Sequence, residues 1–169
     1  MKNYFKIVDG YPQTYSGKTA IDDTWQEFTV TDGVYSPAEL NDAIVALETK
    51  EAKANKINEI KQDCTANDPV SLSVIFKDAT TKNITFNGGD SSAAAISGAI
   101  ELATTLGETQ VALWDSNNIV HTGISFDEAL SISVSIAKKY RDDMIKRQGL
   151  LNQIDAATTK EELELITWN

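Results

Sequence analysis

The chain has 169 residues, of which 41% are hydrophobic and 24% charged, and its formal net charge is −10. This composition predicts one ordinary folded domain, or a small domain with an appendage, and excludes a disordered chain. So acidic a surface would repel phosphate backbones, and we therefore expect no nucleic-acid partner.

Residues 1–35 are predicted to form a small β region. The stretches "NYFKIV" (3–8) and "TWQEFTV" (24–30) alternate loosely between apolar and polar residues, and an Asp-Gly turn signal follows each of them. A polar segment with Pro12 and Gly17 lies between them. The aromatic side chains of this region are candidates for docking a partner, although we favour a core role for them; they are Tyr4, Tyr11, Tyr15 and Trp25.

A long helix is predicted next, within residues 36–66. Ser36 suits the N-cap, Pro37 the first helical position, and Glu39 completes a capping box. No helix breaker follows until Asn67-Asp68-Pro69, which predicts about 28 helical residues, or roughly 42 Å. Its apolar stripe is narrow, so the helix is either a coiled-coil or partner-docking element or a connector packed on its own domain; the docking candidates are Leu40, Ile44 and Leu47.

A β-hairpin and a helix follow Pro69. The β-rich runs 70–76 and 82–86 predict the hairpin, and the helix begins within "FNGGDSSAAAISGAI", with Asp90 or Ser91 as its cap. The two glycines suggest a phosphate-binding loop, but no Gly-Lys-Ser/Thr ending is present and an aspartate at the mouth would repel an anion. We therefore predict a capped helix start whose apolar positions are Ile96, Ala99, Ile100, Ala103 and Leu106.

The C-terminal third predicts a second hairpin and two helices. Residues 109–115, which contain Trp114, and 119–122 form the hairpin. Ser125 opens a capping box with Glu128, and a long helix follows with an apolar stripe that includes Phe126, Leu130, Val134, Ala137, Tyr140, Met144, Leu151 and Ile154. A short last helix, capped by Thr158 or Thr159, turns Leu163, Ile166 and Trp168 inward.

This order of elements predicts an α+β fold. Small antiparallel β-hairpins would carry helices on one face, preceded by the N-terminal β region and the long helix. We expect three parts: a partner-docking β region at 1–35, a connector or coiled-coil-like helix at 36–66, and an α+β domain at 67–169.

Few residues suit catalysis or metal binding. The chain has one cysteine, Cys64, and one histidine, His121, which we place at the surface or the edge of a strand. A Cys/His zinc cluster is therefore impossible. Carboxylate pairs such as Asp142-Asp143 fit solvated helix faces. We predict no catalytic, cofactor-binding or metal-ligating residue, no cofactor, and no enzyme. No apolar run reaches the roughly 18 residues that span a membrane, so we expect no membrane insertion.

Four stretches carry a family resemblance. They are "KINEIKQD" before the first hairpin, "FNGGDSSAAAISGAIELA", "ALWDSNNIV", and the closing "LLNQIDAATTKEELELITW". Together they make residues from about 56 to 168 resemble the domain of unknown function near the C-terminal end of many phage and prophage tail proteins. The motif positions are Asp90, Ser91, Trp114, Ser125 and Trp168.

The resemblance implies a virus-tail setting rather than a reaction. It favours a structural or adaptor protein of the virion tail, near the tail fibres or baseplate, made in the bacterial host cytoplasm. Its partners would be other tail or tail-fibre proteins and copies of itself, with a trimer expected. A tail-fibre assembly chaperone is the alternative. A carbohydrate- or receptor-binding tail module is the third possibility, and the positions of Tyr11, Tyr15, Asp22 and Trp25 bear on it.

Overall fold

The computed structural model describes residues 2–9, 11–30 and 36–169, and it contains two compact units. The first comprises Met1–Lys56 and Ala157–Leu165, and the second comprises Ile57–Ala156 and Ile166–Asn169. Both helices and antiparallel strands are present, and strands at the N-terminus precede the first helix. The predicted α+β class is therefore confirmed.

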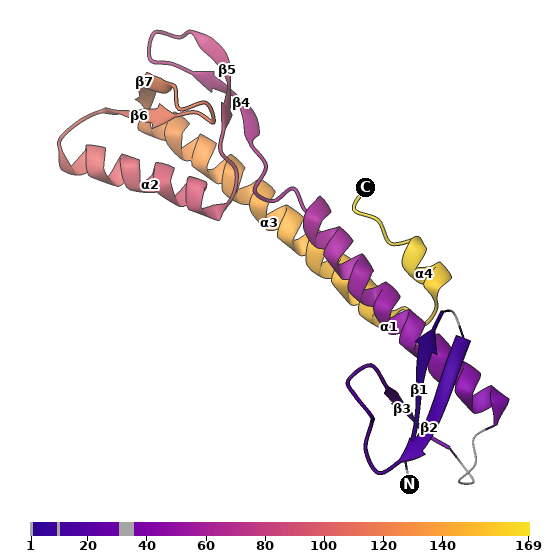
Figure 1. Ribbon diagram of the computed structural model, residues 1–169. Helices are drawn as coiled ribbons and strands as arrows, with labels where there is room; N and C mark the ends of the chain where they lie inside the picture. The colour runs from indigo at the N-terminus through magenta and orange to yellow at the C-terminus, as the bar shows by residue number, and fades with distance from the viewer. Residues whose placement is uncertain (1, 10, 31–35) are drawn as a thin grey trace. The chain divides into compact units, whose positions relative to one another are not determined.

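The first unit begins with a three-stranded antiparallel sheet (Figure 1). Its strands are β1 (Lys2–Val8), β2 (Tyr11–Gly17) and β3 (Gln26–Phe28), in the order β2-β1-β3. Strand β2 is a correction, because the sequence predicts a polar connection there. The chain reverses at Asp9, whose φ is 51°, and all seven residues of β2 then pair with β1. Backbone pairing, and not an apolar pattern, makes this segment a strand. The residues from 31 to 35 lie outside the described part of the chain.

Both helices that begin in this unit have capping boxes, of which the sequence predicts the first and, for the second, a cap at Thr158 or Thr159. Helix α1 (Pro37–Asp63) starts after Ser36, whose N–H donates to the Glu39 carboxylate at 2.7 Å while the Glu39 N–H donates to Ser36 Oγ at 3.2 Å. Helix α4 (Lys160–Glu164) starts after Thr159, which forms the same reciprocal pair with Glu162. These bonds satisfy N–H groups that the first turn of a helix leaves unpaired.

The second unit contains the two predicted hairpins. Strands β4 (Val70–Ile75) and β5 (Thr81–Phe86) form one, and β6 (Gln110–Trp114) and β7 (Val120–Ser125) form the other. An antiparallel bridge between Phe76 and Ile124 connects the two hairpins, and the Lys77 N–H donates to the Gly123 carbonyl at 3.0 Å.

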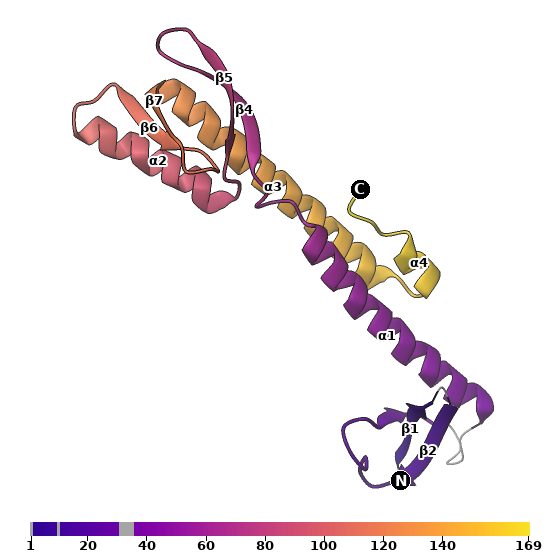
Figure 2. The same cartoon turned by 45° about the horizontal axis from the view of Figure 1, so that its top comes forward.

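Helices α2 (Asp90–Thr105) and α3 (Phe126–Ala156) pack on each other and on these strands (Figures 1 and 2). The Ser133 hydroxyl, buried between the helices, donates to the Ala93 carbonyl at 2.8 Å and lies 3.0 Å from the Ser97 hydroxyl. The core draws on all six elements and consists of Val74, Ile84, Phe86, Ala93, Ile96, Val111, Leu113, Ile124, Ala129, Ile132 and Ile136.

Two predicted apolar stripes differ from these core positions. On α3 the buried residues near the start are Ala129, Ile132, Ser133 and Ile136, whereas Leu130 and Val134 are exposed. Small Ala and Ser side chains let α2 approach α3 closely, and that contact selects the core face. On α2 the predicted core residue Leu106 is also exposed, at the C-terminal end of the helix.

The cap of α2 is a further correction. The N-cap is Gly89, with φ of 89° and no side-chain cap bond, so Asp90 is the first helical residue and Ser91 the second. A positive φ suits glycine, and the N-cap therefore falls at Gly89, one residue before Asp90 and two before Ser91. The Asp90 carboxylate still lies in the first turn, where a negative charge interacts favourably with the helix dipole.

Ser125 forms half of its predicted capping box. The Glu128 N–H donates to Ser125 Oγ at 3.2 Å. The Glu128 carboxylate accepts the Ile75 N–H of β4 at 2.9 Å instead of returning to Ser125. Glu128 therefore connects the start of α3 to the first hairpin.

Candidate functional site

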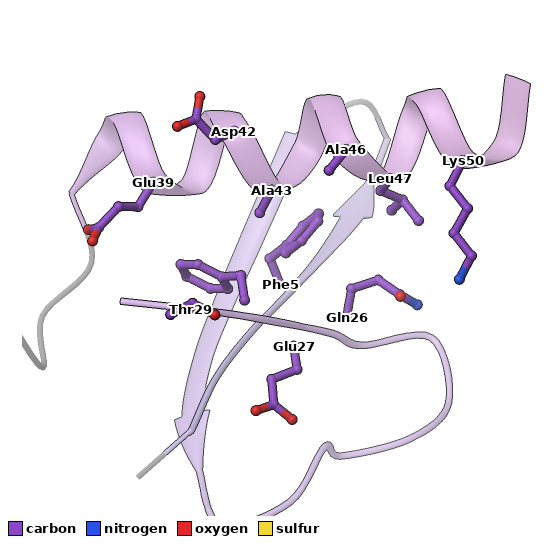
Figure 3. Close-up of a pocket in the computed structure, with 11 residues that line it drawn as sticks. Phe5, Gln26, Glu27, Thr29, Glu39, Asp42, Ala43, Ala46, Leu47 and Lys50 are labelled. Atoms are coloured by element: carbon purple, nitrogen blue, oxygen red, sulfur yellow. The ribbon is translucent and has the colours of Figure 1, made fainter. Parts of the chain in front are cut away.

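The first unit has a hollow between the sheet and α1, shown in Figure 3. Its volume is about 440 Å³. The Phe5 ring points toward Ala43 and Leu47 of the helix and meets Phe28 edge-on, with ring centroids 5.9 Å apart. Two of the three carboxylates that line the hollow have structural partners, because Glu39 belongs to the capping box and Glu27 forms an ion pair with Lys2 at 2.8 Å. This hollow is an apolar packing contact with a polar rim.

The other face of the sheet carries the predicted docking aromatics. The Tyr4 and Tyr15 rings stack across β1 and β2 with centroids 6.3 Å apart, and Tyr15 meets Trp25 at 5.9 Å. Tyr4 is only 4% exposed, so it belongs to the core and is unsuited to docking, because Tyr15 packs against it. Tyr11 is 76% exposed, whereas Tyr15 and Trp25 are partly covered.

The predicted docking residues of α1 are half-buried. Leu40, Ile44 and Leu47 each keep part of their surface, and Ile44 and Leu47 line a second hollow of about 610 Å³ together with Ile7 and Val8 of β1. The fold thus brings Ile44 and Leu47 against the sheet of the same unit.

Asp22, whose position the sequence analysis links to the carbohydrate-binding alternative, takes part in a local turn. It accepts the Thr24 N–H at 2.9 Å and also bonds the Thr24 hydroxyl. The Thr24 hydroxyl, followed by the backbone N–H, lowers the pKa of Asp22. Its described bonds are those of a turn.

In the second unit, Asp115 and His121 form a buried pair at the β6–β7 turn. His121 Nε2 lies 3.1 Å from Asp115 Oδ2, and Asp115 Oδ1 accepts the N–H groups of Asn117 at 2.8 Å and Ile119 at 2.9 Å. The Ile119 N–H, followed by the His121 side chain, lowers the pKa of the Asp115 carboxyl. His121 is therefore half-buried, and it lies near the start of β7 in a two-stranded sheet, which agrees with the strand-edge alternative of its predicted position. The described residues contain no group of three side chains placed to hold a metal ion.

A groove between α2 and β6 has a largely apolar lining. It is about 300 Å³, and we call it the α2–β6 groove; its lining residues are Phe86, Asn87, Ser92, Ala95, Ile96, Ala99, Ala112, Leu113 and Trp114. Trp114 forms one wall and is 61% exposed. Its cross-strand neighbour Val120 is exposed as well, so the apolar surface continues onto β7. Figure 2 shows α2 beside the β6–β7 hairpin that supplies this wall.

The opposite wall continues along α2 beyond the groove. Leu102 and Leu106 are 62% and 65% exposed. With a rotation of roughly 100° per residue they fall on the same helix face as Ala95 and Ala99. We call this face the outer stripe, and it comprises Ser92, Ala95, Ala99, Leu102 and Leu106. Contiguous exposed apolar side chains are a common feature of interaction sites in folded proteins.

Residues 51–167 match the family model described as a domain of unknown function, DUF4376. The match covers more than half of the 169 residues. The chain belongs to the DUF4376 family. No curated protein and no solved structure matches the chain.

The DUF4376 stretch includes the α2–β6 groove and Trp114, and it ends one residue before Trp168. Trp114 is a wall of the groove, whereas Trp168 is half-buried beneath Lys146, whose Nζ lies 4.8 Å from the ring centroid. Trp168 is thus more exposed than predicted. Leu102 and Ala112 were not singled out from the sequence, although the spacing of Leu102 from Ala95 and Ala99 could have placed it on one stripe with them.

No helix in the described part of the chain combines the length and the hydropathy that crossing a lipid bilayer requires.

Proposed function

We propose that this chain is a non-catalytic structural or adaptor subunit of a bacteriophage tail, located near the tail fibres or baseplate. The observation that carries the proposal is the exposed apolar surface of the family domain, where Trp114, Leu102 and Leu106 lie outside a well-formed core. Monomeric proteins seldom leave neighbouring apolar side chains such as Leu102 and Leu106 exposed, and Trp is enriched where partners bind.

The tail setting is supported by the sequence resemblance of residues from about 56 to 168. The family match at residues 51–167 spans nearly the same stretch, so one domain carries both the resemblance and the apolar surface. Its partners would be other tail or tail-fibre proteins, together with copies of the chain in a trimer, and its location would be the virion tail after synthesis in the host cytoplasm.

Quantitative mass spectrometry of purified, mature particles beside the crude lysate tests this proposal. A structural subunit is expected at a fixed ratio to the major tail protein in every particle preparation. A chain that is abundant in the lysate but missing from the particles would be a tail-fibre assembly chaperone, and that result would overturn the proposal.

A further inference from the structure

We propose that Asn87 is a site of spontaneous deamidation, which converts a neutral side chain of the α2–β6 groove into a carboxylate. Asn87-Gly88 is the only Asn-Gly pair in the chain. Asparagine is among the chemically labile residues of proteins, and a following glycine has no Cβ to shield its own amide nitrogen. This inference concerns the chemistry of one loop and does not depend on the tail role.

The structure leaves both reacting groups without a protein partner. Asn87 directly follows β5 and precedes α2, and its side chain is exposed. Among the described residues, none forms a hydrogen bond with the Asn87 carboxamide and none accepts the Gly88 N–H. The Gly88 nitrogen can therefore approach the carboxamide carbon, Cγ of Asn87, without breaking a hydrogen bond to the protein.

Two other exposed loop asparagines provide an internal comparison. Asn117 and Asn118 lie in the β6–β7 turn, and the amide that follows each of them is engaged. The Asn118 N–H donates to the Asp115 carbonyl at 3.0 Å, and the Ile119 N–H donates to Asp115 Oδ1 at 2.9 Å. Both of these nitrogens also belong to residues that have a Cβ. Attack at either position would break a hydrogen bond of the turn, so we expect Asn117 and Asn118 to react much more slowly than Asn87.

The reaction consumes only water. The Gly88 nitrogen loses its proton to the solvent and bonds to Cγ of Asn87, while the carboxamide nitrogen takes up a proton and leaves as ammonia. Water then opens the resulting five-membered succinimide ring at one of its two carbonyl carbons. Opening at Cγ gives aspartate, and opening at the main-chain carbon gives isoaspartate. In both products one water has replaced one ammonia, and nothing is oxidised or reduced.

The two products change this part of the second unit differently. Asn87 lines the α2–β6 groove, and none of the described lining residues is charged, so either product introduces a charge there. The aspartate carboxyl has an ordinary pKa of about 3.9 and is ionised at neutral pH. Isoaspartate also adds a methylene to the main chain next to Gly88, which packs directly against the Asp68 backbone. That product should therefore disturb the contact between Gly88 and Asp68 as well.

The test uses the full-length folded chain, incubated at physiological temperature in mildly alkaline buffer, because base removes the Gly88 amide proton. Samples taken over time are digested, and mass spectrometry measures at each asparagine the mass increase that replacement of NH2 by OH brings. Endoprotease Asp-N, which cleaves before aspartate and not before isoaspartate, separates the two products. Asn87→Gln is the control variant, because the longer side chain would have to close a six-membered ring, which forms far more slowly. Circular dichroism establishes that both chains are folded.

Asn87 is expected to convert at least tenfold faster than Asn117 or Asn118, with isoaspartate among its products. Asn87→Gln should abolish the fast conversion and leave the slow conversion elsewhere unchanged. Equal rates at the three asparagines, or no conversion at Asn87 in the folded chain, would overturn the proposal. Conversion at Asn87 that occurs only after unfolding in urea would also overturn it, because the folded loop would then hold the reacting groups apart.

Discussion

Gly88 lies directly against the backbone of Asp68, and a Cβ atom on Gly88 would stand 2.0 Å from the Asp68 carbonyl oxygen. This contact joins the loop after α1 to the segment before α2. The glycine pair before α2 therefore has a packing function: Gly88 admits the neighbouring backbone, and Gly89 supplies the positive φ of the cap.

Gly88→Ala is expected to destabilise the second unit by about 1–3 kcal/mol, because the backbone of Asp68 cannot move aside as a flexible side chain would. Urea denaturation followed by circular dichroism measures this change. Gly98→Ala is the matched control. A Cβ on Gly98 meets no atom within 4 Å, and alanine in the interior of a helix should raise stability by about 0.5–1 kcal/mol. Equal losses in the two variants would contradict the packing explanation.

The burial of Tyr4 and the exposure of Tyr11 predict opposite outcomes for two tyrosine substitutions in one sheet. Tyr4→Ala should lower the free energy of unfolding by about 3 kcal/mol, because it removes a buried ring that stacks on Tyr15. Tyr11→Ala should change it by less than about 0.5 kcal/mol. Thermal or urea denaturation of the two variants measures both values. A large loss for Tyr11→Ala would show that its side chain is part of the core.

The Ser133 hydroxyl is the buried polar contact between α2 and α3. Ser133→Ala should cost about 0.5–1.5 kcal/mol, since it removes the bond to the Ala93 carbonyl and the contact with Ser97. Ser131→Ala, on the exposed side of the same helix, is the control and should be nearly neutral. Denaturation curves that coincide for the two variants would mean that the hydroxyl contributes nothing to helix packing.

Acid should weaken the β6–β7 turn through Asp115. Because its pKa is lowered in the folded chain, the stabilisation by this carboxylate is complete above the unfolded-state pKa of about 3.9 and is lost as the pH falls through the lower folded value. Asp115→Asn should lower the denaturation midpoint at neutral pH, and its difference from wild type should shrink as the pH falls below about 4. A difference that stays constant over this range would argue against the role of the charge.

The capping signals allowed the sequence to predict most of the helices. Ser36 with Glu39 and Thr159 with Glu162 mark their helix starts by side-chain bonds within one turn, and such local chemistry can be read from neighbouring residues. The cap of α2 could not be read in this way, since Gly89 caps it by conformation alone.

Tertiary contacts decided what the sequence could not predict. The segment "YPQTYSG" has no apolar alternation, and only pairing with β1 makes it a strand. The start of α3 is apolar on more than one face, so periodicity alone could not choose Ile132 and Ile136 over Leu130 and Val134. The outer stripe has the same origin, because Leu106 fits a core stripe in the sequence and becomes exposed only when α2 turns Ile96 and Ala103 inward.

The most direct test of the account is incorporation of variants into particles. A phage that lacks this gene is complemented with the wild-type chain, Leu102→Asp or Leu130→Asp, and the amount of the chain relative to the major tail protein is measured in purified particles. We predict the same fixed ratio for the wild type and Leu130→Asp, and at least a tenfold lower ratio for Leu102→Asp. Absence of the wild-type chain from mature particles would contradict the central claim that it is a subunit of the tail.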